Sequence, residues 1–205
     1  MNKPRPQREL AKTLLQARGI MRMAELRKAG VTGATMSRME RAGEVIRLSR
    51  GVYQLADADL DPNHSLAEAA KRLPKGVVCL VSALAFHGLT DQMPAKVWMA
   101  IGSKDWVSKH SESSMWIVRF SDSLLHEEVE TEQIEGVDVK VFSVPKTIAD
   151  CFRHRSKVGL SVAIEGLQEA LRQRKTTPAK IALQAEKGGV STVIRPYLDA
   201  LTANA

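Results

Sequence analysis

The chain has little of what several classes of protein require. It carries only two cysteines, Cys79 and Cys151, which excludes a disulfide framework, and the apolar neighbours of both favour buried, reduced thiols. No apolar run approaches the roughly 20 residues that a membrane helix needs. The N-terminus is basic, but no apolar stretch follows it, so we expect no secretory signal. These absences predict a cytoplasmic protein without membrane contact.

The motifs of catalysis are also missing. The five histidines show no metal-ligand spacing, neither cysteine has a Cys-x-x-Cys partner, and no glycine-rich phosphate loop occurs. We therefore predict no catalytic residue, no metal site and no cofactor. The alternative is a metal-dependent nuclease, because Asp138 and Lys140 match the acid-x-lysine half of its motif, with Glu130 and Glu132 nearby in sequence.

Positive charge is present but concentrated in one place. Of 205 residues with a formal net charge of +7, the first 55 hold 12 Lys/Arg and 4 Asp/Glu, a net charge of +8. The remaining 150 residues, with 18 Lys/Arg and 19 Asp/Glu, carry −1. A basic block beside a neutral one indicates a module that binds nucleic acid or an anionic surface.

The pattern of apolar and turn residues divides the chain. The segment 57–63 is acidic, contains Pro62 and has no periodicity, so it is predicted to link a domain of residues 1–56 to one of residues 64–205. In the first domain we expect helices at residues 7–18, 23–29 and 33–42 and a hairpin of strands 45–48 and 52–55. Three helices and a hairpin in a basic domain predict a winged helix-turn-helix.

The second part mixes strands and helices. We expect strands at residues 96–101, 115–120, 128–134 and 137–142, and helices at 65–73, 82–87, 145–153, 160–174, 178–187 and 192–201, with an apolar run at 77–81 before the second of these helices. Strands followed by helices predict an α+β fold, with Pro196 starting or kinking the last helix.

The third helix of the first domain is the one expected to enter the major groove. At about 100° per residue, Met36 and Met39 face a core, while a separate arc carries small and cationic side chains. Thr32 and Thr35 at the start of the helix are expected to meet phosphate. Candidate DNA-binding residues are Lys28, Thr32, Ala34, Thr35, Ser37, Arg38, Arg41, Arg47, Arg50 and Tyr53.

Four segments of the chain resemble one known family. They are residues 38–55, with Arg38-Met39-Glu40-Arg41-Ala42-Gly43 and Arg50-Gly51-Val52-Tyr53; residues 81–90, with Phe86-His87-Gly88-Leu89; residues 143–160, with Ser143-Val144-Pro145-Lys146-Thr147; and residues 195–201, with Arg195-Pro196-Tyr197-Leu198. Together they resemble the AbiEi family of antitoxins and autorepressors of type IV toxin–antitoxin systems, in order along nearly the whole chain.

The resemblance implies a bacterial repressor that binds double-stranded operator DNA, usually at inverted repeats, where it can oligomerise. It also implies a second domain that neutralises a nucleotidyltransferase-like toxin without a stable complex. Within the segments that resemble the family, Lys146, Thr147 and Asp150 are the polar residues considered for antitoxin function. A winged-helix regulator with no toxin partner is the remaining alternative.

Overall fold

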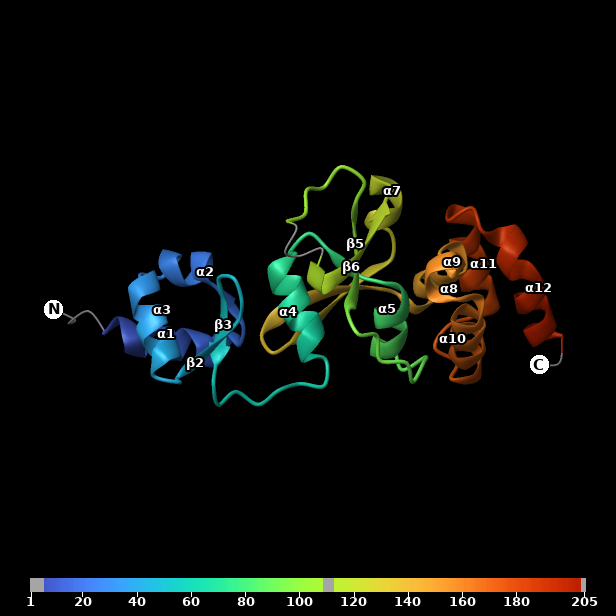
Figure 1. Ribbon diagram of the computed structural model, residues 1–205. Helices are drawn as coiled ribbons and strands as arrows, with labels where there is room; N and C mark the ends of the chain where they lie inside the picture. The colour runs from blue at the N-terminus through green and yellow to red at the C-terminus, as the bar shows by residue number, and fades with distance from the viewer. Residues whose placement is uncertain (1–5, 109–112, 204–205) are drawn as a thin grey trace. The chain divides into compact units, whose positions relative to one another are not determined.

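Helices and strands alternate along the chain and confirm the predicted mixed α+β class (Figure 1). The computed structural model describes residues 6–108 and 113–203. Contacts divide the chain into two compact units, one of residues 1–74 with 132–139 and the other of residues 75–131 with 140–205. The predicted linker at residues 57–63 stays a prediction. The limits of the two units are a separate observation.

The first unit holds short helices and a small antiparallel sheet. Its elements are α1 (Gln7–Arg18), β1 (Met21–Arg22), α2 (Met23–Lys28), α3 (Gly33–Arg41), β2 (Val45–Ser49), β3 (Val52–Leu55) and α4 (His64–Arg72). The strand order is β1-β3-β2, with both pairings antiparallel. The strand β1 is too short, at two residues, to show any alternation in the sequence, and it was not predicted.

Residues 132–139 form part of this first unit through one carboxylate. Glu135 occupies a turn with φ of 49°, next to Gly136 with φ of 70°. Its side chain accepts hydrogen bonds from the Asp61 backbone N–H at 2.7 Å and from Gln54 Nε2 at 3.3 Å, and lies 2.8 Å from His64 Nδ1. Three polar groups distant in sequence therefore converge on one acidic residue, which no local pattern indicates.

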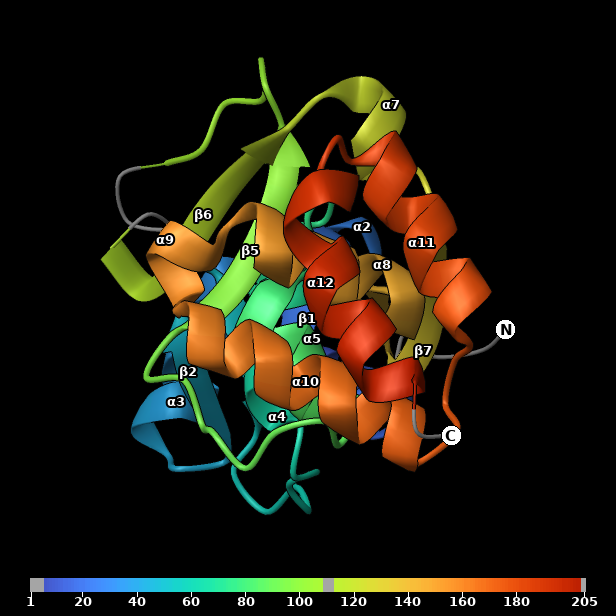
Figure 2. The ribbon, with the colours of Figure 1, turned by 90° about the vertical axis from the view of Figure 1, so that its right-hand side faces the viewer.

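A sheet of five strands is the base of the second unit, although residues 132–139 of its last two strands and the turn between them are grouped with the first unit. The strands are β4 (Val77–Val78), β5 (Val97–Gly102), β6 (Met115–Phe120), β7 (Val129–Ile134) and β8 (Val137–Phe142). Their order is β6-β5-β4-β8-β7, so β6 and β7 are the outer strands. The β4–β8 and β5–β6 pairings are parallel, and β4–β5 is antiparallel. Figure 2 shows β6 beside β5.

Helices of the second unit include α5 (Leu80–Phe86), α7 (Asp122–Leu125), α8 (Val144–Arg153), α9 (Arg155–Val158), α10 (Leu160–Arg172), α11 (Pro178–Lys187) and α12 (Ser191–Thr202). The helices α5 and α7 pack against β5 of the sheet, and most of the other helices pack around one central helix. The helix α8 packs against α5, α10 and α11, and its residues 144–152 are all buried. Pro196 lies inside α12.

The apolar run at residues 77–81 divides between a strand and a helix. They form a strand only at Val77–Val78, because α5 already begins at Leu80 after Cys79 in an extended conformation. An apolar run of this length suits a strand or a buried helix equally, and packing decides between them. The short helices α7 and α9 were not predicted either, since four residues show no periodicity.

The polar residues considered for antitoxin function lie inside the second unit. Lys146, Thr147 and Asp150 are 2%, 0% and 2% exposed. Lys146 Nζ lies 2.8 Å from Asp150 Oδ2, and the Thr147 hydroxyl donates to the Phe142 carbonyl oxygen at 3.1 Å. Burial raises the pKa of Asp150, and the nearby Lys146 ammonium opposes that shift. Their polar groups are thus used within the fold.

We expect Lys146→Met to lower the free energy of unfolding by about 3–5 kcal/mol, because it leaves the Asp150 carboxylate buried without its partner. The double variant Lys146→Met/Asp150→Leu removes both charges and is expected to recover most of that loss. Urea unfolding of the full chain measures both values. A double variant less stable than Lys146→Met alone would contradict this account of the pair.

Candidate nucleic-acid interface

The helix α3 divides into a buried and an exposed face. Thr35, Met36 and Met39 are buried, whereas the arc expected to face DNA, which comprises Ala34, Ser37, Arg38 and Arg41, is exposed. The buried side belongs to an apolar cluster with Leu15 of α1 and Tyr53 of β3. Packing on one side therefore holds the polar arc towards solvent.

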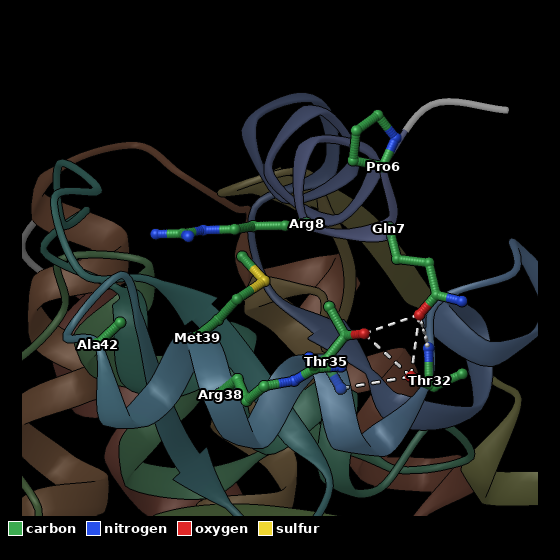
Figure 3. A pocket seen from close by; sticks show the side chains of 8 residues that line it. All are labelled: Pro6, Gln7, Arg8, Thr32, Thr35, Arg38, Met39 and Ala42. Atoms are coloured by element: carbon green, nitrogen blue, oxygen red, sulfur yellow. Dashed lines mark hydrogen bonds between the residues drawn. The ribbon is translucent and has the colours of Figure 1, made fainter. Parts of the chain in front are cut away.

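A single side chain ties the start of α3 to the start of α1 (Figure 3). The Gln7 Oε1 atom accepts hydrogen bonds from the Thr35 hydroxyl at 2.7 Å, the Thr32 hydroxyl at 2.9 Å and the Thr32 backbone N–H at 3.2 Å. Thr32 also caps α3, since its hydroxyl accepts from the Thr35 backbone N–H at 3.3 Å. The direction of α3 relative to α1 thus depends on Gln7.

Beside this junction lies a hollow of about 490 Å³. It is lined by Pro6, Gln7, Arg8, Thr32, Thr35, Arg38, Met39 and Ala42, which Figure 3 labels. Five of these, Pro6, Gln7, Arg8, Met39 and Ala42, were not among the predicted site residues. For Gln7 and Arg8 the only signal in the sequence is a polar first turn of α1, which is common to many helices.

The cations of the predicted interface are not neutralised. Arg38 Nε donates to the Ala34 carbonyl and Arg41 Nε to the Ser37 carbonyl, each at 3.3 Å, so both side chains lie along their own helix. Within the described part of the chain, no carboxylate lies within 4.0 Å of Lys28, Arg38, Arg41, Arg47 or Arg50. Their charge remains available to an anionic partner.

Two acidic residues of the same unit are paired with cations outside α3. Glu44 binds Arg8, whose Nε donates at 2.8 Å, and Lys12 at 3.2 Å. Glu25 accepts from the Arg22 backbone N–H at 2.6 Å and from Lys71 at 3.0 Å. Burial raises the pKa of Glu25, but these two partners outweigh it and hold the pKa below its ordinary value. Neither of these two carboxylates therefore neutralises the positive charge of Arg38 and Arg41.

The β2–β3 hairpin turns at Arg50 and Gly51, where Gly51 has φ of 74°. Arg47 and Arg50 are exposed, as is Lys28 in the last turn of α2. Tyr53, in contrast, is only 6% exposed and packs in the apolar cluster. Of the predicted residues in this region, the cations are open to a ligand and the tyrosine is part of the core.

The hydroxyls of the two threonines at the start of α3 have partners within the protein, whereas the sequence predicts that they meet phosphate. Thr35 is 7% exposed and its hydroxyl is taken by Gln7, so it lies inside the helix junction. The Thr32 hydroxyl is likewise used by Gln7 and the helix cap, although Thr32 itself is exposed. Sequence spacing identified the start of α3 but could not show that α1 supplies the partner.

The alternative nuclease residues lie on β7 and β8. Asp138 accepts a hydrogen bond from Gln133 across the hairpin, and Glu130 and Glu132 are exposed. Within residues 6–108 and 113–203, no group of three or more His, Cys, Asp or Glu side chains is placed to hold a metal ion. Among these same residues, no helix combines the length and the apolar character needed to cross a membrane.

Comparison with known proteins bears on the same region. Residues 8–56 match the family model of the transcriptional regulators described as AbiEi antitoxins. This match confirms the resemblance over the first quarter of the chain and supports a regulatory role. No curated protein matches the sequence.

One solved structure shares the fold over most of the chain. The RV2827C protein from Mycobacterium tuberculosis is similar with a TM-score of 0.61 and 12% identity, covering 98% of this chain and 83% of that protein. At this identity the likeness concerns the fold alone.

We expect Gln7→Leu to destabilise the first unit by about 1–3 kcal/mol, because it removes the acceptor that the Thr32 and Thr35 hydroxyls share and leaves them only each other, at 3.0 Å. Chemical denaturation of the full chain, followed by circular dichroism, measures the loss. Gln16→Leu is the matched control, since Gln16 is exposed on the same helix and no hydrogen bond of its side chain is observed. Equal stability of the two variants would show that Gln7 does not hold the junction.

Proposed function

We propose that the chain is a DNA-binding transcriptional regulator that represses its own operon. In this proposal residues 1–56 form a winged helix-turn-helix domain, in which α3 enters the major groove and the β2–β3 hairpin is the wing. The observation that carries it is the exposed arc of Ala34, Ser37, Arg38 and Arg41, whose two guanidinium groups have no carboxylate partner among the described residues. The family match over residues 8–56 supports the same role.

The residues divide the work of binding. Small side chains at Ala34 and Ser37 allow close approach to the groove floor, and the Arg38 and Arg41 guanidinium groups can each donate two hydrogen bonds to a guanine edge. Lys28, Arg47 and Arg50 lie outside that arc and are proposed to contact phosphate or the minor groove. Phosphate neutralisation supplies affinity that depends on salt, and α3 supplies the choice of sequence.

The antitoxin role is proposed on the family resemblance. In it, residues 64–205 neutralise a nucleotidyltransferase-like toxin without a stable complex. Co-expression of the full chain with such a toxin from a neighbouring gene tests it, with growth as the readout. Because the two roles belong to separate domains in this proposal, Arg38→Ala/Arg41→Ala is expected to neutralise the toxin as the unchanged chain does.

We expect the double variant Arg38→Ala/Arg41→Ala to bind the DNA upstream of its own gene at least tenfold more weakly, since each good arginine–base pair contributes about 1–3 kcal/mol. Fluorescence anisotropy with a labelled duplex measures the dissociation constant. The control is Arg195→Ala, an exposed arginine of α12 in the second unit. Unchanged operator binding by the double variant would reject α3 as the reading helix.

Arg50→Ala and Lys28→Ala are expected to weaken binding to operator and to unrelated duplex alike, because phosphate contacts carry no sequence information. Each variant is expected to reduce the slope of log K against log salt concentration by about 1. Titrations at four salt concentrations give the slope. A slope equal to that of the unchanged protein would show that neither side chain contacts phosphate.

A further inference from the structure

A second concave surface lies in the other unit, along the outer strand β6. Its volume is about 530 Å³, and its walls are the five successive residues Met115–Arg119 with Trp98 of β5, His154 and Lys157. We call it the β6 groove. Since β6 ends the sheet and pairs only with β5, the main-chain donors and acceptors of its other edge have no strand partner among the described residues.

Two tryptophans form an aromatic platform in the β6 groove. Trp98 and Trp116 are paired in register across β5 and β6, and their ring centroids lie 4.7 Å apart. Trp98 is 9% exposed, whereas Trp116 is 37% exposed. The two rings are tilted by 49°, and the buried ring packs against the exposed one, so the open part of the Trp116 ring is held in place at little cost in side-chain entropy.

The charges of the groove have one sign. Arg119 and Lys157 are the charged side chains among its walls, and no carboxylate lines it. Arg119 is held in place because its Nη1 donates to the carbonyl oxygens of Asp105 at 2.8 Å and Gly102 at 3.3 Å. In the described residues neither cation forms an ion pair. Side chains alternate along the regular strand β6, so Arg119 projects from the face opposite to Trp116, and Lys157 is the cation available to an anion beside that ring.

Unpartnered polar atoms gather in the same place. Four buried side-chain atoms of the described residues lack a hydrogen-bond partner, and two of them, Trp98 Nε1 and His154 Nε2, belong to walls of this groove. Burial and the nearby Arg153 and Lys157 lower the pKa of His154 to about 4, so its ring is neutral at pH 7. Leaving such groups unpaired costs free energy, and two such groups in the walls of one groove mark it as unlike the rest of the unit.

We propose that the β6 groove binds a nucleotide, with its base stacked on Trp116 and its phosphate at Lys157. The free edge of β6 supplies the donors and acceptors that a base edge requires, and a base satisfies the aromatic face while phosphate satisfies the lysine. A peptide strand could also pair with β6, but it would leave the combination of platform and cation unexplained. This site is independent of DNA binding by α3.

Titration of the full chain with uridine 5′-monophosphate and adenosine 5′-monophosphate tests the proposal, with calorimetry and tryptophan fluorescence as readouts. We expect saturable binding that Trp116→Ala weakens about tenfold or more, as loss of base stacking does, and that Lys157→Gln also weakens. The matched controls are Trp106→Ala and Lys180→Gln, both exposed in the same unit and outside the groove. Both controls are expected to bind as the unchanged protein does.

Two sources of the nucleotide are distinguished in the same experiment. A dinucleotide that binds more tightly than the mononucleotide, with the same dependence on Trp116, identifies the end of a single strand; equal affinity identifies the free nucleotide. This arm is run in the Arg38→Ala/Arg41→Ala background, so that the proposed duplex interface does not contribute.

Three results would overturn the proposal. They are absence of saturation at millimolar nucleotide, equal affinity of Trp116→Ala and the unchanged chain, and binding of inorganic phosphate as tight as that of the nucleotide. If instead the peptide of residues 127–134, which forms β7 here, binds at Trp116 while nucleotides do not, the β6 groove is a site for strand addition.

Discussion

The burial of residues 144–152 of α8 is the constraint on which the second unit depends. This part of the helix packs against α5, α10 and α11 and is closed to water, yet it carries Lys146 and Asp150. The two side chains lie one turn apart and neutralise each other at 2.8 Å, and the lysine also lies 4.4 Å from the centre of the Phe142 ring. Because the pair is closed within one helix, the surrounding helices can pack with apolar side chains.

One backbone oxygen connects the end of β8 to α8 and to the end of α5. The Phe142 carbonyl oxygen, at the end of β8, accepts from the Thr147 hydroxyl and lies 2.8 Å from His87 Nε2. This oxygen therefore joins the sheet, α8 and the end of α5. The segments Ser143–Thr147 and Phe86–Leu89 are among those that resemble the AbiEi family. In the structure, Thr147 and His87 of these segments hold the second unit together.

In the first unit, in contrast to the buried ion pair of α8, cations lie unpaired on the surface. Its carboxylates at Glu25 and Glu44 are used by Lys71, Arg8 and Lys12, so the cations of α3 stay unpaired on its surface. A surface arginine of this kind adds little to stability. Its placement is consistent with an anionic partner, which is the role proposed for α3. The β6 groove shows the same combination of unpaired cations and no carboxylate, with an aromatic face in addition.

The sequence by itself determined the fold class, most of the long elements, the basic character of the first 55 residues and the exposed arc of α3, because periodicity and charge are local properties of the chain. Tertiary structure alone decided the rest. Gln7 reaches Thr32 and Thr35 across 25 and 28 residues, and Trp98 meets Trp116 across the β5–β6 pairing. Such partners depend on how elements pack. Nothing in the local sequence marks these side chains, because their role arises only when folding brings a distant group into contact with them.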